Sequence, residues 1–241
     1  MQTMATTVNK QKIVNHLFTA FGRHAKTKPA TERPILEHFL YAILRENTTR
    51  ESADLAFTSL QERFFDWNEV RVSSTLEIVE ALDGIVPDAE TRAQRMIDFL
   101  QEIFETTYSF DLQPLLEKLQ KKGLKQASKE LSRYPSANDY VVAWVMQHSL
   151  NGHALALDAA AQRCLKRMGL VEEDGDYETL RASIEHQVPK AKGPQFIDML
   201  SDLADAHCHE DEPACGHCPL RSVCPTGQEH KAMASASKKP R

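Results

Sequence analysis

Residues 208–224, CHEDEPACGHCPLRSVC, place four of the chain's five cysteines at the spacing C-x6-C-x2-C-x5-C. Four sulfurs this close in sequence can surround one metal centre, because the short connections between them leave little chain to order. We call this stretch the cysteine loop. It predicts a sulfur-ligated metal centre held by Cys208, Cys215, Cys218 and Cys224.

Several kinds of site can be built from four cysteines. Zinc modules usually present two C-x2-C-like pairs, and here only Cys215 and Cys218 form such a pair. The outer spacings of six and five residues indicate wider loops around a bulkier group, which favours a [4Fe-4S] cluster over structural zinc. Disulfide pairing is a third alternative, disfavoured in a chain that we expect to be cytosolic. Cys164 lies far along the chain within a predicted helix and is interpreted as a buried small residue.

The composition is that of an ordinary globular protein. Of the 241 residues, 41% are hydrophobic and 26% are charged. There is no run of about 18 apolar residues that could span a membrane, and residues 1–21 do not resemble a signal peptide. We therefore expect a soluble, cytoplasmic protein with no membrane partner, associated with the nucleoid if it is bacterial.

The charge is unevenly distributed. A net charge of −5 argues weakly against a nucleic-acid partner. Within residues 118–133, however, basic side chains outnumber acidic ones, with Glu117 and Glu130 as the only neighbouring carboxylates. We call these side chains the basic patch: Lys118, Lys121, Lys122, Lys125, Lys129 and Arg133. They form either a nucleic-acid-binding surface or simply a solvated helix face.

Apolar residues recur at helical spacing along most of the chain, and no segment shows sustained period-two alternation. The sequence therefore predicts an all-α fold with short loops. Ser73 or Ser74 is expected to cap a helix that ends at Gly84, and Gly123 to separate two short helices. The expected helices cover residues 13–21, 34–44, 53–64, 74–82, 89–104, 115–119, 124–131, 139–149, 159–168, 177–187 and 194–206.

The cysteine spacing near the end of an all-α chain resembles the iron-sulfur loop of the endonuclease III family, the helix-hairpin-helix DNA glycosylases. The resemblance covers residues 30–225. Arg92-Ala93 followed by Ile97 resembles the family's Lys-Ala-x-x-Ile helix start, and residues 177–208 have the length of its penultimate helices.

Two further segments resemble family motifs. Leu157-Asp158 followed by Arg163 and Arg167 resembles V-D-T-H-x-x-R-x-x-x-R, with two alanines in place of Thr and His. Residues 43–49, ILRENTT, stand where the family has L-L-S-x-Q-T/A-x. This places Asn47 at the glutamine that probes the opened duplex.

The family's L-P-G-V-G-R-K hairpin, which grips a DNA phosphate, corresponds to residues 134–140, YPSANDY. Both glycines are replaced. Asparagine tolerates the left-handed conformation best, so Asn138 is expected to keep the turn. Ser136 and the carboxylate of Asp139 should weaken phosphate binding. The alternative is a plain helix-helix turn that does not touch DNA.

Tyr140 stands at the position of the lysine that attacks the sugar. Without an amine no Schiff base can form, so lyase chemistry is not expected. A tyrosine here resembles the archaeal thymine-mismatch glycosylases, which are monofunctional. Asp158 matches the family's essential aspartate, which would stabilise an oxocarbenium-like sugar and help water attack. Its alternative role is the N-cap of the helix that starts at Ala159.

The resemblance implies a two-lobed helix-hairpin-helix glycosylase fold with a C-terminal [4Fe-4S] loop. Residues 34–150, including the hairpin, would form a helical barrel. Residues 11–33 would join 151–224 in a cluster domain, with 1–10 and 225–241 disordered. A cleft between the lobes would bring Tyr140 and Asp158 together, near the basic patch.

The implied function is monofunctional N-glycosidic cleavage of a flipped base during base-excision repair, by a monomer bound to damaged or mismatched duplex DNA. Catalysis would use Asp158 and Tyr140. The expected DNA contacts are Asn47, Ser136, Asn138, Lys125, Lys129 and Arg163, although Arg163 and Arg167 could instead pair within the fold.

Two other readings remain open. The altered hairpin, the lost Thr-His pair and the acidic total charge favour a non-catalytic DNA-binding or protein-interaction module that retains a structural [4Fe-4S] cluster. A zinc-stabilised helical scaffold is the third hypothesis.

Overall fold

The computed structural model describes residues 9–22 and 33–236, and within them the regular structure is entirely helical. The predicted all-α class is confirmed. The chain divides into two compact units. In terms of described residues, one comprises residues 33–158, and the other comprises 9–22 together with 159–236.

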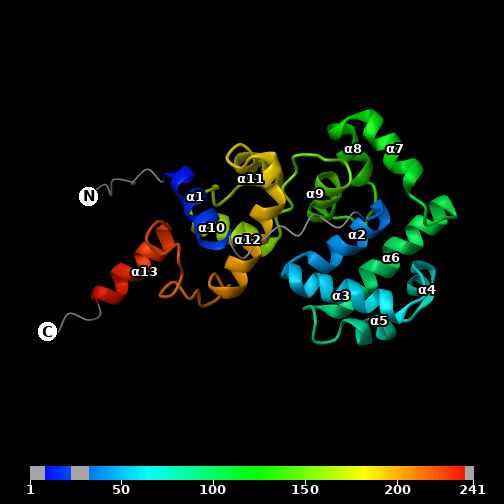
Figure 1. Cartoon of the computed structure of the whole chain (residues 1–241), viewed down its shortest axis with the longest axis horizontal. Coiled ribbons are helices and arrows are strands. Elements are labelled where there is room, and N and C mark those ends of the chain that lie inside the picture. Colours follow the sequence, from blue (N-terminus) through cyan, green and yellow to red (C-terminus); the bar gives the residue numbers. More distant parts are fainter. Residues whose placement is uncertain (1–8, 23–32, 237–241) are drawn as a thin grey trace. The chain divides into compact units, whose positions relative to one another are not determined.

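The unit of residues 33–158 is built around one central helix, α2 (Ile35–Arg45) (Figure 1). Ten of its eleven residues are buried, and α3, α6 and α9 pack against it. The other helices of this unit are α3 (Arg50–Arg63), α4 (Trp67–Val72), α5 (Thr75–Leu82), α6 (Ala89–Thr107), α7 (Gln113–Lys122), α8 (Leu124–Leu131) and α9 (Asp139–His148).

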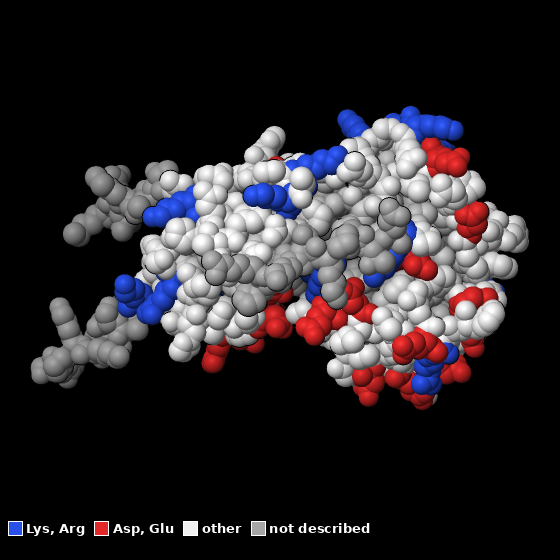
Figure 2. All heavy atoms as spheres, viewed as in Figure 1, with Lys and Arg blue, Asp and Glu red and all other residues white. Residues whose placement is uncertain are grey.

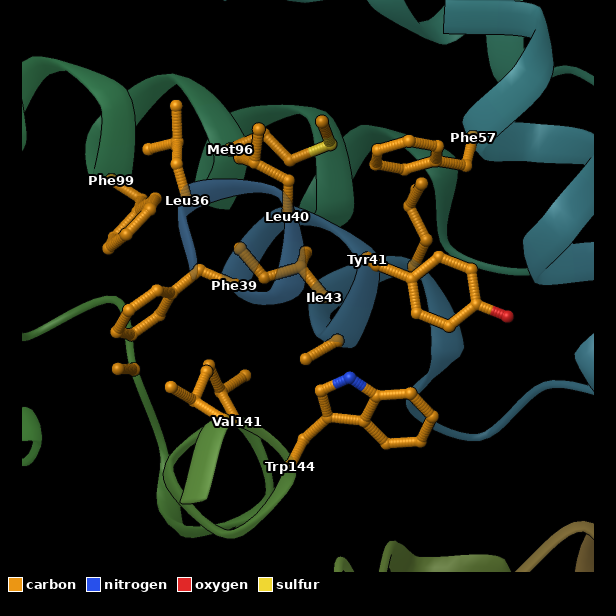
Figure 3. Close-up of a cluster of buried hydrophobic side chains, with 14 of the residues drawn as sticks. Leu36, Phe39, Leu40, Tyr41, Ile43, Phe57, Met96, Phe99, Val141 and Trp144 are labelled. Atoms are coloured by element: carbon orange, nitrogen blue, oxygen red, sulfur yellow. The ribbon is translucent and has the colours of Figure 1, made fainter. Parts of the chain in front are cut away.

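Large apolar side chains surround α2 on several sides (Figure 3). Phe39 stacks on Phe99 of α6 with ring centroids 4.6 Å apart. On the side of α9, Tyr41 packs against Trp144 at 5.5 Å. Each such buried side chain contributes about 1.5–3 kcal/mol, so packing rather than helix propensity holds α2 in place.

Polar residues begin and end these helices largely as predicted. Ser74, not Ser73, starts α5 with a capping box that includes Glu77. Gly84 and Gly123 adopt positive φ values of 68° and 77°, which glycine allows without strain. Helix α4 was not predicted, because six residues are too few to show a period. Its signal was Asp66, whose carboxylate accepts from the Glu69 N–H at 2.8 Å.

The second unit packs α12 (Gly193–Ala206) against α1 (Lys10–Phe21) and α10 (Ala159–Arg167). Leu17 and Phe196 are fully buried in its core. It also contains α11 (Tyr177–Glu185), the 3-10 turn η1 (Lys190–Lys192) and α13 (Pro225–Ala236). None of the helices in the described part of the chain is long and apolar enough to cross a bilayer.

Two predicted boundaries are wrong. Residues 151–158 belong to the first unit, because the Gly152 N–H donates to the Met146 carbonyl and the Asn47 N–H donates to Asp158, both at 2.8 Å. Residues 225–236, expected to be disordered, form α13. The Thr226 hydroxyl anchors its start by donating to the Arg167 carbonyl at 3.0 Å.

The rest of the predicted disorder, apart from residues 9 and 10, lies outside the described residues. Residues 1–8 and 237–241 are not described. Asn9 is described, and its side chain caps α1 by accepting from the Lys12 N–H at 3.0 Å.

Arg92, at the start of α6, satisfies the end of α2. The residue is 5% exposed, and its guanidinium donates to the carbonyls of Ile43, Leu44 and Glu46 at 2.5–3.0 Å. It also donates to the Pro87 carbonyl at 2.7 Å. The last carbonyls of a helix have no partner within the helix, and a cation there is favoured by the helix dipole. Burial lowers the pKa of Arg92, opposed by the charge of Glu46.

We predict that Arg92→Met destabilises the protein by about 2–4 kcal/mol, because buried carbonyls lose their donors. Both tryptophans, Trp67 and Trp144, lie in this unit, so urea unfolding followed by their fluorescence measures the loss. The matched control is Arg63→Met, which removes a half-exposed ion pair with Glu80 and should cost at most about 1 kcal/mol. Equal losses in both variants would contradict the role given to Arg92.

A buried histidine of α2, His38, pairs with a partly buried one of α9, His148. The rings of His38 and His148 stack with centroids 5.6 Å apart, and His148 also stacks on Trp144 at 4.2 Å. Burial, together with the positive charge of Arg33, lowers the pKa of His38 to about 4. Burial, followed by the charges of His38 and Arg33, lowers the pKa of His148 to about 3. Both rings are therefore neutral in the folded protein at pH 7.

This predicts a loss of stability as the pH falls from about 6.5 to 4. In this range the two histidines bind protons in the unfolded chain but stay neutral in the folded chain. His148→Phe keeps the ring stacking and removes one titrating group, so it should flatten the dependence of unfolding free energy on pH. His16→Phe, at an exposed position on α1, is the control and should leave the slope unchanged. If the unfolding free energy of His148→Phe depends on pH as steeply as that of the wild type, His148 is not one of the groups that cause the dependence.

Candidate functional site

The turn between α2 and α3, residues 45–49, is held by a carboxylate from 111 residues away in sequence. The Asn47 N–H donates to Asp158 Oδ2 at 2.8 Å. Asn47 has a left-handed φ of 53°, and Asp158 is only 7% exposed. The structure thus brings together two residues that the sequence analysis singled out, with Asp158 fixing the backbone at Asn47.

Glu46 ties this turn to the turn before α9. Its Oε1 accepts from Asn138 Nδ2 at 2.8 Å, and its Oε2 accepts from Arg95 at 2.7 Å. The Arg95 and Glu46 side chains are 25% and 16% exposed, so the ion pair is partly shielded from solvent. Sequence reasoning missed Glu46 and Arg95, because each stands at an unspecified position of its motif and their partners are distant in sequence.

Asn138 was expected in the left-handed conformation, and this is wrong. It has φ −70° and ψ 176°, and its Oδ1 caps α9 by accepting from the Val141 N–H at 3.0 Å. None of residues 134–140 has a positive φ. Instead the turn closes through the Ala137 N–H, which donates to the Tyr134 carbonyl at 2.9 Å. Ser136 is partly exposed at its tip.

Tyr140 lies in the first turn of α9 and is 3% exposed. Its ring stacks on Trp144 at 6.2 Å, and Trp144 stacks on His148 at 4.2 Å. Residues four apart share one face of a helix, so these three rings form a continuous row along α9. Tyr140 and Asp158 both belong to the unit of residues 33–158.

The basic patch lies on α7 and α8, at the upper right of Figure 2. Glu130 accepts from Lys122 at 2.7 Å and lies 3.4 Å from Lys118. The bond from Lys122 lowers the pKa of the Glu130 carboxyl. The remaining basic side chains are exposed and have no ion-pair partner within the described ranges: Lys121, Lys125, Lys129 and Arg133.

Arg163 and Arg167 of α10 bind the cysteine loop. Arg163 Nε donates to the Cys208 carbonyl at 3.0 Å. Arg167 lies 3.5 Å from Cys208 Sγ and donates to the Glu210 carbonyl at 2.6 Å. Of the two roles left open for these arginines, the structure shows pairing within the fold. The Arg167 carbonyl also accepts from Thr226, so one residue anchors both ends of the loop.

The four predicted cysteine ligands line one pocket of about 30 Å³, together with Arg167, Arg221 and apolar side chains such as Leu203 and Leu220. One water molecule needs about 10–15 Å³ of such a volume, so the space between the sulfurs is larger than a single water. No three His, Cys, Asp or Glu side chains in residues 9–22 and 33–236 lie close enough together to hold a metal ion. The sulfurs therefore surround a space rather than converge on one point.

The thiols differ in acidity. A hydrogen bond with Cys164, and then the Arg167 guanidinium, lower the pKa of Cys208 to about 6 against the effect of burial. Burial raises the pKa of Cys215, Cys218 and Cys224, and the charge of Cys208 raises all three further. Four ionised sulfurs would thus need a positive centre among them. Cys164 is fully buried in α10, as predicted.

Comparison with known proteins identifies distant relatives. No model of a known protein family matches the chain. It is 26% identical to endonuclease III of Bacillus subtilis over 100 residues, which is 42% of this chain and 46% of that protein. It is 21% identical to a putative DNA glycosylase of Arabidopsis thaliana over 160 residues, 66% of this chain and 52% of the relative. The chain thus spans about half the length of each.

Solved structures extend this similarity over most of the chain. A trapped covalent intermediate of endonuclease III with DNA matches with a TM-score of 0.66 at 16% identity, covering 93% of this chain and all of that one. A thermostable thymine-DNA glycosylase matches with a TM-score of 0.61 at 19% identity, covering 91% and 97%. A 3-methyladenine DNA glycosylase of H. pylori matches with a TM-score of 0.58 at 16% identity, covering 82% of this chain and 98% of that one. The chain therefore has the fold of endonuclease III and related helix-hairpin-helix DNA glycosylases.

Proposed function

We propose that this protein is a DNA glycosylase of base-excision repair, which cleaves the N-glycosidic bond of a flipped base without cutting the strand. The observation that carries the proposal is the buried carboxylate of Asp158, held by the Asn47 N–H in a glycosylase fold. The named activities of the relatives, endonuclease III and a putative DNA glycosylase, point in the same direction.

The proposed chemistry depends on the charge of Asp158. As the base departs, the sugar gains positive charge, which a nearby carboxylate stabilises. The same carboxylate can accept a proton from the water that attacks the sugar. The Asn47 N–H occupies one oxygen at 2.8 Å, so it would fix the orientation of the carboxylate.

Tyr140 supports a monofunctional reaction. A lyase that forms a Schiff base needs an amine, and the phenol of Tyr140 cannot supply one. Enzymes that act on flipped bases hold them between aromatic and apolar side chains. We propose that Tyr140, at the head of the row of rings on α9, shapes the pocket for the base.

The proposed partner is damaged or mismatched duplex DNA, bound by a monomer. Lys125 and Lys129 are exposed and carry no ion pair within the described residues, as phosphate contacts require. Asn47 and Ser136 sit on the two turns that Glu46 and Asn138 connect. Asn138 and Arg163 would act by positioning these turns and the cysteine loop rather than by touching DNA.

We further propose that the cysteine loop binds a [4Fe-4S] cluster through Cys208, Cys215, Cys218 and Cys224. A group wider than a single ion suits four sulfurs that surround a space. Arg167 and Arg221 in the lining would offset the negative charge of the thiolates. The cluster would hold the loop together after the chain folds.

Asp158→Asn should retain the hydrogen bond from Asn47 and lose about 10²–10⁴-fold of the single-turnover rate of base release. The measurement uses duplexes that each carry one mismatched or damaged base, with alkali added to reveal abasic sites. Asp83→Asn, an exposed carboxylate after α5, should keep the full rate. Equal rates in Asp158→Asn and wild type would disprove the mechanism. Wild-type protein that binds these duplexes but releases no base would favour the non-catalytic module.

Cys215→Ser should abolish absorbance near 400 nm and the equal amounts of iron and sulfide expected in the wild type. Cys164→Ala is the control, because Cys164 contacts Cys208 but does not itself line the pocket. It should keep the colour and the metal content. A colourless wild-type protein with bound zinc would overturn the cluster assignment, and one with neither metal would overturn the metal site.

A further inference from the structure

We propose that a pocket formed by α2, α3 and α4 binds an arginine side chain from a basic segment of a partner protein. The pocket has a volume of about 310 Å³ and shares no lining residue with the candidate site above. Two fully buried aliphatic side chains, Leu60 and Val70, line it. Its polar and aromatic lining consists of Glu37, Gln61, Phe64, Phe65, Asp66 and Trp67.

Among the described residues that line it, the pocket has two carboxylates and no basic side chain. Glu37 Oε1 accepts from Trp67 Nε1 at 3.4 Å, and Asp66 Oδ1 accepts from the Glu69 N–H at 2.8 Å. Neither carboxylate has an ion-pair partner among residues 9–22 and 33–236. Each therefore has lone pairs left for a cationic donor.

Aromatic side chains complete a surface suited to a guanidinium. Trp67, Phe64 and Phe65 line the pocket, and Phe65 has 94% of its surface exposed. A guanidinium binds carboxylates through two parallel hydrogen bonds and stacks on aromatic faces, which an ammonium does less well. One exposed apolar residue is ordinary in itself, but this one borders two unpaired carboxylates.

The surroundings select the class of partner. Residues 50–90 contain ten acidic and only three basic side chains, and acidic side chains gather over α3 to α5 at the lower right of Figure 2. This field repels nucleic acid and attracts a positively charged segment. A free polyamine would leave Phe65 uncovered, whereas apolar residues beside an arginine in a polypeptide would cover it. We therefore assign the pocket to a protein partner.

The test titrates the protein with a capped penta-arginine peptide and follows the indole N–H signals of its two tryptophans by NMR. Trp67 lines the pocket, while Trp144 is buried against Tyr41 and is the internal control. We expect a saturable shift of the Trp67 signal alone. Glu37→Gln and Asp66→Asn should each weaken binding about tenfold. Both variants keep their internal hydrogen bonds. The glutamine carbonyl can still accept from Trp67, and asparagine caps a helix as well as aspartate does.

Glu62→Gln removes the same charge from an exposed position on α3 outside the pocket, and should leave binding nearly unchanged. An equal loss of binding in Glu62→Gln would show that the peptide responds only to the overall negative charge of this surface, and would overturn the proposal. So would spermidine binding at Trp67 as tightly as penta-arginine, or the absence of any saturable shift. Unchanged circular dichroism of all three variants establishes that they remain folded.

Discussion

The end of α2 imposes the constraint on which the candidate site depends. This helix is buried on almost every side, so its final carbonyls cannot be satisfied by water and need donors from the protein. Arg92 supplies them from α6. With the helix end fixed, the chain leaves it in a left-handed turn at Asn47, whose N–H then points to Asp158. The carboxylate proposed for catalysis is thus positioned through the core.

A similar arrangement organises the second unit. The guanidinium of Arg167 binds the start of the cysteine loop, and its own carbonyl accepts from Thr226 after the loop ends. Both arrangements use an arginine from a helix to satisfy backbone carbonyls, those at the end of α2 in the first unit and those of the cysteine loop in the second. This suits arginine, whose rigid fork presents several donors in fixed directions. The turn at Asn47 and the cysteine loop are therefore each held in place by an arginine of a helix.

The sequence was sufficient for those parts of the structure that depend on local pattern. The apolar spacing predicted the all-α class, and Ser74, Gly84 and Gly123 marked helix ends through their own conformational preferences. Asp158 and Asn47 were found through a motif resemblance. Glu46 and Arg95 could not be found in this way, because their value lies in a pairing across 49 residues that no local rule encodes. Asn138 was misjudged because asparagine suits both a left-handed turn and an N-cap, and only the fold decides between them.

The net charge hides a separation of basic and acidic surfaces within residues 33–158. The chain's total of −5 argued weakly against nucleic acid, yet exposed lysines gather on α7 and α8 while carboxylates dominate residues 50–90 (Figure 2). Exposed charges are screened beyond about 8 Å at physiological salt, so a ligand responds to the nearest surface rather than to the sum. A polyanion and a basic protein segment can therefore each find a complementary face on the same unit. Acidic total charge and DNA binding are consequently compatible here, and the acidic face suits the basic segment that we propose as its partner.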